Sequence, residues 1–139
     1  MSDNVKQIIK HLTEQLWALP FREYLASEDF SRFCREHDLV DVWAGILDLS
    51  QSIPNLYGDM GIKHAFVLLL HHIYLGRQKE FPEMFTCLVA GFSRGISSPL
   101  PLDNLKKDLV LLGYSEQEIE HEFSGMNKKN CLNHGEKAF

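Results

Sequence analysis

The sequence predicts an all-α fold, a single compact bundle of six to seven helices with a buried central helix near residues 62–76 and a C-terminal helical hairpin. Apolar residues recur at three- and four-residue steps along most of the chain, and the two-residue alternation typical of strands is rare. The stretch from Ile62 to Leu75 is nearly apolar on all sides, which indicates a helix enclosed by its neighbours. Residues 102–124 contain the start and stop signals of two consecutive helices.

Length and composition indicate one domain. The chain has 139 residues, of which 45% are hydrophobic and 24% are charged, as in ordinary globular proteins. We assign residues 1–124 to an all-helical domain. Residues 125–139 have few apolar side chains and are interpreted as a polar tail or linker.

The sequence also indicates a cellular compartment. The central apolar stretch of about fourteen residues is shorter than the roughly twenty that a membrane span needs, and Met1 is not followed by the apolar region of a signal peptide. Three widely spaced cysteines without a Cys-x-x-Cys pair indicate reduced thiols. We therefore expect a soluble, cytoplasmic protein with no membrane partner.

The first predicted helix runs from about residue 3 to residue 19. Its apolar residues follow helical spacing, and Pro20 ends it because proline cannot continue a helix. On the opposite face we expect three solvated side chains, those of Lys6, Lys10 and Thr13.

Two shorter helices are predicted next. Ser27 is a good N-cap for a helix that continues to about His37, and two acidic residues follow it where the helix dipole favours negative charge. Another helix covers about residues 39–52, with Asp38 or Asp41 as its expected cap.

The central helix is expected to end at Gly76. Pro82 then favours the first turn of a further helix, where its missing N–H has no hydrogen bond to lose. A loop over residues 93–101 separates this helix from the C-terminal hairpin.

The hairpin has the clearest local signals in the chain. Gly113 supplies the left-handed C′ residue that ends one helix, and Ser115 with Glu118 forms a capping box that begins the next. Ile119 and Phe123 form its inward stripe. The predicted interaction surface is the set of acidic residues outside this stripe, namely Glu116, Glu118, Glu120 and Glu122.

The formal net charge of −5 disfavours a general nucleic-acid-binding surface. Such surfaces begin with clustered Lys and Arg side chains that displace counterions from phosphate. Here the basic doublets at 106–107 and 128–129 are isolated, and Arg32 and Arg35 lie among acidic residues. Nucleic acid is therefore not an expected partner.

The histidines and carboxylates do not show the spacing of a metal site. His64 and His71 share one face of the central helix, but seven positions separate them by about 10 Å along its axis. Ligands of one metal come far more readily from positions three or four apart. A single Glu118-x-x-His121 unit resembles the motif that carboxylate-bridged di-iron bundles use twice. We expect no metal and no cofactor.

Two short patterns resemble enzyme motifs. Arg32 and His37 fit the Arg-x4-His pattern of HEPN-type ribonucleases, which are small all-helical proteins that often act as toxins or defence effectors. The resemblance implies that the arginine steadies a phosphate transition state and the histidine handles the 2′-hydroxyl proton. However, Phe33 follows the arginine, where that family usually has a polar residue. His37 and Asp38 also resemble the dyad that begins the metal site of HD-type phosphohydrolases, over two residues only.

We favour a function without catalysis. Gly91, Ser93 and Gly95 have the spacing of a Gly-x-Ser-x-Gly motif, but no strand is predicted before them, and the chain has no glycine-rich loop between a strand and a helix. Small acidic helical domains that lack a catalytic constellation most often bind other proteins. The predicted function is a protein–protein interaction or regulatory module, with a protein partner or a second copy as ligand. In general appearance it resembles helical modules of prokaryotic defence or signalling proteins.

Two alternatives to the interaction module remain open. The first is a HEPN-like ribonuclease or toxin that uses Arg32 and His37. The second is a site for a small apolar ligand among Trp43, Phe66 and Phe85, because such residues have the same sequence pattern whether they fill a core or line a pocket.

Overall fold

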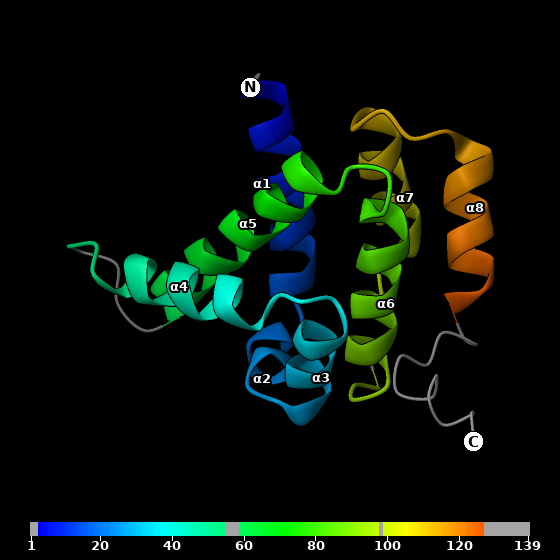
Figure 1. Ribbon diagram of the computed structural model, residues 1–139. Helices are drawn as coiled ribbons and strands as arrows, with labels where there is room; N and C mark the ends of the chain where they lie inside the picture. The colour runs from blue at the N-terminus through cyan, green and yellow to red at the C-terminus, as the bar shows by residue number, and fades with distance from the viewer. Residues whose placement is uncertain (1–2, 55–58, 98, 127–139) are drawn as a thin grey trace.

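The computed structural model describes residues 3–54, 59–97 and 99–126, and within these ranges it contains eight α-helices and no β-strand (Figure 1). The predicted all-α fold is therefore confirmed. In chain order the helices are α1 (Asp3–Trp17), α2 (Phe21–Leu25), α3 (Glu28–Glu36), α4 (Val40–Gln51), α5 (Asp59–Gly76), α6 (Phe81–Ser93), α7 (Leu102–Leu111) and α8 (Glu116–Ser124).

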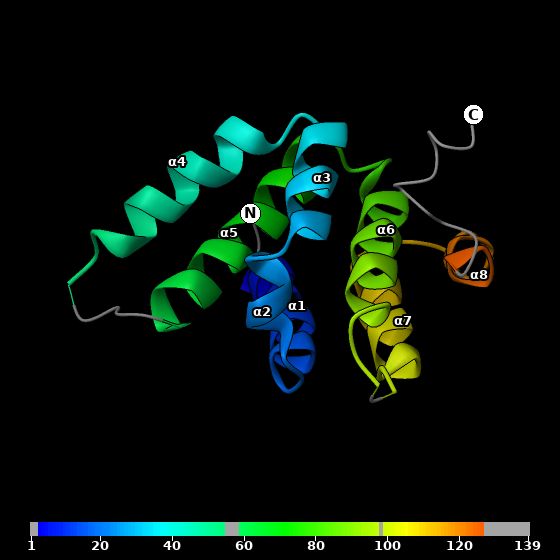
Figure 2. The same ribbon diagram turned by 90° about the horizontal axis from the view of Figure 1, so that it is seen from below.

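The arrangement places α1 between α5 and α7, while α6 packs against α3 and α8. Helices α7 and α8 contact each other and form the predicted C-terminal hairpin. Helix α4 lies alongside α5, and the far end of this pair extends away from the other helices (Figures 1 and 2). Much of the surface of α4 and α5 is therefore left without a neighbouring helix.

Helix α2 is the element that the sequence analysis missed. Helix α1 ends at Trp17, before Pro20, as the proline predicts, but Pro20 is also the N-cap of a second short helix. Proline cannot continue a helix because it lacks an N–H group, yet the start of a helix does not need that group. The described residues therefore form eight helices instead of six to seven.

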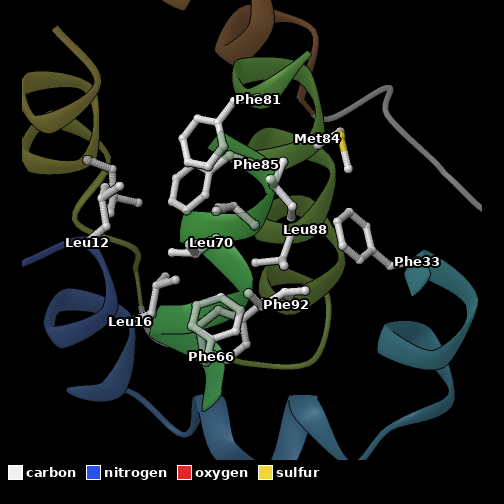
Figure 3. Close-up of a cluster of buried hydrophobic side chains, with 14 of the residues drawn as sticks. Leu12, Leu16, Phe33, Phe66, Leu70, Phe81, Met84, Phe85, Leu88 and Phe92 are labelled. Carbon is white, nitrogen blue, oxygen red and sulfur yellow. The ribbon is translucent and has the colours of Figure 1, made fainter. Parts of the chain in front are cut away.

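Aromatic and aliphatic side chains from different helices meet in one core (Figure 3). The ring of Phe21 lies edge-on to Phe66 and to Phe92, with ring centroids 4.8 Å apart in both pairs. Leu70 of α5 and Phe85 of α6 are almost completely buried in the same cluster. These contacts hold α5 against α2 and α6 through one side of α5.

Helix α5 is deeply buried along this side, as the apolar run predicts, but its opposite side is not enclosed. His71 is half-buried, His72 is exposed, and the side chain of Leu75 is 61% exposed. The reason is that α1 crosses α5 at an angle and covers only part of its length (Figure 1). The expectation of a helix enclosed all round therefore applies to one face only.

The predicted signals at the hairpin turn are present in the structure. Gly113 has a φ of 112°, and the Tyr114 N–H donates to the Leu109 carbonyl oxygen at 3.2 Å, which is the hydrogen bond of a Schellman motif. The Oγ of Ser115 accepts a hydrogen bond from the Glu118 N–H at 3.1 Å, so Ser115 is the N-cap of α8.

The start of α4 differs from the prediction. Neither Asp38 nor Asp41 caps it, because its N-cap is Leu39, which forms no side-chain capping bond. Asp38 instead has a φ of 59° and ends α3, and the Leu39 N–H donates to the Cys34 carbonyl oxygen at 2.7 Å. Aspartate is one of the few residues besides glycine that tolerate this left-handed conformation.

Two further side chains, one in α1 and one after α8, are buried contrary to the sequence-based expectation. Thr13, expected in solvent, is completely buried, and its Oγ1 donates to the Ile9 carbonyl oxygen at 3.1 Å. Met126 is 8% exposed, so buried side chains continue two residues past position 124. Residues 127–139 of the predicted tail lie outside the described residues.

Candidate interaction surface

Two neighbouring hollows run along the surface where α1 crosses α5. Each has a volume of about 370 Å³, and they share Lys10 and Val67, so we treat them as one feature and name it the α1–α5 groove. Its lining residues are Lys6, Lys10 and Glu14 of α1, together with Met60, Lys63, His64, Val67, Leu68, His71 and Leu75 of α5.

Much of the groove lining is apolar. Val67 and Leu68 are partly exposed, and the side chains of Met60 and Leu75 are 60% and 61% exposed. The long stems of Lys6 and Lys10 add further carbon atoms to the lining. Contiguous apolar surface of this kind, bordered by polar groups, is typical of a binding site.

The charges in the groove have the opposite sign to the net charge of the chain. Three lysines and one glutamate line it, whereas the whole chain carries a formal net charge of −5. The Lys63 Nζ already donates to the Glu14 Oε1 at 2.8 Å. The positive charges of Lys6 and Lys10 therefore dominate, and the groove is suited to an acidic ligand.

Both histidines that line the groove are influenced by burial. Burial lowers the pKa of His71 below the usual histidine value of 6.5, and the nearby positive charge of Lys6 lowers it further. The Nδ1 atom of His64 is buried without a hydrogen-bond partner among the described residues. His71 is therefore held in its neutral form, and its ring adds to the apolar part of the groove at neutral pH.

The outer side of α4 is the second exposed surface with apolar character. Its exposed residues recur at helical spacing, because α4 uses its other side to pack against α5. Seven large apolar side chains are exposed among the described residues, and five of them lie between positions 40 and 75. The seven are Val40, Leu49, Ile53, Met60, Leu75, Val110 and Leu111.

A polar cluster between α1 and α7 was not found from the sequence. The Nδ1 of His11 lies 2.6 Å from the Asp108 Oδ2, and the Gln15 Nε2 donates to the same oxygen at 2.7 Å. The Asp108 side chain is 6% exposed, whereas that of His11 is 60% exposed. In the sequence, the sign of this cluster is that Asp108 interrupts an apolar stripe formed by Leu105 and Leu112, which lie three positions before it and four positions after it.

This cluster is best explained as a structural link. The Asp108 carboxylate accepts two hydrogen bonds from side chains of α1 and so connects helices that are distant in sequence.

The four predicted interaction residues of the hairpin do not share one face. Glu116, Glu118 and Glu120 are exposed and Glu122 is partly exposed. Positions 116 and 120 lie on one flank of the buried stripe and positions 118 and 122 on the other, because four residues correspond to about one helical turn. The Lys106 Nζ donates to the Glu120 Oε1 at 3.3 Å. The hairpin therefore presents two separate acidic edges.

The two residues of the ribonuclease hypothesis point to different sides of α3. Five positions correspond to about 140° of rotation around a helix. The Arg32 Nη1 lies 3.7 Å from the Asp29 Oδ1, and the His37 ring packs against Phe33 with centroids 4.7 Å apart. The structure does not bring Arg32 and His37 together around one hollow, and the ribonuclease reading stays a prediction.

Within residues 3–54, 59–97 and 99–126, no group of three or more His, Cys, Asp or Glu side chains is arranged to hold a metal ion. In the same ranges, no helix combines the length and the apolar character that are needed to cross a bilayer. Comparison of the chain with known protein families, curated proteins and solved structures finds no match.

Proposed function

We propose that this protein is a non-catalytic interaction module that binds an acidic, amphipathic helix of a protein partner in the α1–α5 groove. One observation carries the proposal: exposed apolar side chains and an excess of lysine occur together in a concave surface of an otherwise acidic molecule. An amphipathic helix binds in such a groove through its apolar face. Acidic residues on the flanks of that helix would lie near Lys6 and Lys10.

The acidic edges of the hairpin are a less favourable docking surface. Ile119 and Phe123 are 1% and 7% exposed, so the apolar stripe of α8 is used within the fold. A partner would meet mainly solvated carboxylates there, and exposed charge pairs contribute little to binding. The groove is also more suited to a protruding helix than to a flat bilayer, because its apolar residues lie in hollows.

The test uses a synthetic helix-forming peptide with one apolar stripe flanked by glutamates, labelled with a fluorophore. We expect saturable binding by fluorescence anisotropy, weakened by added salt because the contact includes exposed charges. The double variant Lys6→Glu/Lys10→Glu should raise the Kd at least about tenfold, since two charge contacts become repulsive.

The matched control is Lys107→Glu, because Lys107 is an exposed lysine of α7 outside the groove. It should leave the Kd unchanged, and a peptide with the same apolar stripe flanked by lysines should not bind. Equal affinity of the parent protein and the Lys6/Lys10 variant would refute the proposed binding surface.

A further inference from the structure

We propose that the occupant of the α1–α5 groove is helix α4 of a second copy of this chain, so that copies associate head to tail. This inference rests on the proposed function, because it names the partner of the same groove. Helix α4 is acidic and partly apolar on its exposed side, and the groove is basic and apolar. Each copy would offer one helix to be bound and one groove to bind it.

The exposed side of α4 has the composition that the groove requires. Asp41, Ala44, Gly45, Asp48 and Leu49 are all exposed and recur at three- and four-residue steps, so they form one stripe. Between Val40 and Gln51 the helix contains no lysine or arginine. We name this set of residues the outer stripe of α4.

The charges of the outer stripe and the groove are complementary in sign and in spacing. Asp41 and Asp48 are seven positions apart, or about 10 Å along the helix axis. Lys6 and Lys10 lie about 6 Å apart along α1, and Lys63 lines the groove from α5. A helix bound along the groove can therefore place carboxylates near lysines at two levels.

Gly45 gives a second, independent reason to place another molecule on the outer stripe. It lies on the exposed side of α4, within the helix, where glycine is an unfavourable residue. A Cβ atom added at this position would have no atom within 4 Å, so no contact within the chain requires glycine there. Gly45 and Ala44 have the smallest side chains of the outer stripe, so the backbone of α4 could approach the apolar lining of the groove closely at this point.

Other surfaces of a second copy fit the groove less well. The groove is poorly suited to pair with itself, because two surfaces with an excess of lysine would face each other. The acidic edges of α8 have no apolar residue between their glutamates to cover Val67 and Leu75, since Ile119 is buried. The outer stripe of α4 supplies both carboxylates and the exposed side chain of Leu49.

The geometry also predicts the type of assembly. Helix α4 packs on one side of α5, and the groove lies where α1 crosses α5, so the donor helix and the acceptor groove are separate surfaces of one chain. A copy that gives α4 to one neighbour and receives α4 from another makes a heterologous contact, which produces rings or open chains. We therefore expect an average mass that rises with protein concentration beyond that of one chain.

The experiment measures the mass of the full chain by sedimentation over a concentration series at low and high salt. We expect reversible association that weakens in high salt. Two variants should stay monomeric: Asp41→Lys/Asp48→Lys, which changes the donor helix, and Lys6→Gln/Lys10→Gln, which changes the groove. Each should weaken association by about three- to thirtyfold, because each removes two exposed charge contacts.

Mixing the two variants gives the sharpest outcome. The intact α4 of the groove variant should bind the intact groove of the helix variant, and the assembly should stop at a 1:1 complex. Exposed controls on α7, Asp103→Lys and Lys107→Gln, should associate like the parent chain. Gly45→Gln should weaken association while raising the melting temperature, which separates an interface effect from a loss of folding.

Three results would overturn the inference: a parent chain that stays monomeric at millimolar concentration and low salt, variants that associate as the parent does, or a mixture that forms no 1:1 complex. The acidic probe peptide distinguishes this failure from that of the proposed function. Peptide binding without self-association means that the groove binds another protein. Absence of both means that the groove is not a docking site, and salt-sensitive binding to anionic lipid vesicles through Lys6 and Lys10 would assign it to a membrane surface instead.

Discussion

Asp108 shows how one residue can link distant parts of the chain. It lies on the inward face of α7, and its carboxylate accepts hydrogen bonds from His11 and Gln15, which lie more than ninety positions earlier. A buried carboxylate is costly unless such partners are present. The link between α1 and α7 therefore depends on side chains that no local pattern relates to one another.

Replacement of Asp108 by alanine should lower the free energy of unfolding by about 1–3 kcal/mol, because two partly buried hydrogen bonds to α1 are lost. The measurement is urea denaturation followed by circular dichroism. Asp103→Ala on the same helix is the control, since Asp103 is exposed and its loss should change the stability by no more than about 0.5 kcal/mol. Equal effects of the two substitutions would contradict the structural role of Asp108.

His71 should make stability depend on pH below the usual histidine pKa. Its pKa is lowered in the folded chain by burial and by Lys6, so the unfolded chain binds a proton more readily. The free energy of unfolding should therefore be highest above about pH 6.5 and should fall as the pH drops toward the folded pKa of His71. Histidine ring signals followed by NMR give that pKa directly.

Lys6→Gln should raise the pKa of His71 toward 6.5, because the lysine charge opposes protonation of the ring. Lys107→Gln is the control, because Lys107 lies on α7 outside the groove, and it should leave the pKa of His71 unchanged. A His71 pKa that is unchanged by Lys6→Gln would show that the two side chains are not close in solution.

At the scale of single elements, two helices end through the same backbone motif. Gly113 after α7 and Asp38 after α3 both have positive φ, and the following N–H groups donate back to Leu109 and Cys34. Gly113 was predicted because glycine favours this conformation, whereas an aspartate there resembles an ordinary N-cap for the next helix. The glycine therefore predicts the end of α7, whereas the aspartate does not distinguish the end of α3 from the start of α4.

Two glycine substitutions should have opposite effects on stability. Gly113→Ala should lower the free energy of unfolding by at least about 1 kcal/mol, because alanine is strained at a φ of 112°. Gly45→Ala should raise it by about 0.5–1 kcal/mol, because alanine favours the helix and its Cβ meets no atom within 4 Å. Both values come from thermal and urea unfolding at a concentration where the chain is monomeric. A destabilised Gly45→Ala variant would contradict the exposed position of Gly45.

At the scale of the whole molecule, the two sides of α5 have different roles. Leu70 is 1% exposed in the core, and Leu75 is 61% exposed at the end of the α1–α5 groove. Both are leucines of one apolar helix, and the helical pattern does not distinguish them. Their environments differ because the helices that pack against α5, chiefly α4 and α1, cover only part of its surface (Figure 1).

Leucine-to-alanine substitutions test this difference within one helix. Leu70→Ala should lower the free energy of unfolding by about 2–5 kcal/mol, because it opens a cavity in the core. Leu75→Ala should change it by no more than about 0.5 kcal/mol, because its side chain remains largely in solvent. Chemical denaturation of both variants measures the two values, and similar losses would mean that α5 is covered on both sides.

The helices themselves could be predicted from the chain because their determinants are local. Hydrogen bonds between residues four apart, the Ser115 cap and the left-handed Gly113 depend on neighbours within one or two turns. The all-α class, seven of the eight helices and the hairpin turn follow from such patterns. Helix α2 was missed because Pro20 indicates the end of one helix more strongly than the start of another.

The surfaces depend on contacts between residues that are distant in sequence. Lys6 and Val67 line one groove only because α1 crosses α5 at a particular place, and His11 meets Asp108 only because α1 also packs against α7. A helix that is apolar on all sides has no polar face to show which side will be covered. The residues of the chain therefore specify its helices, whereas helix packing determines which of their faces are exposed for binding.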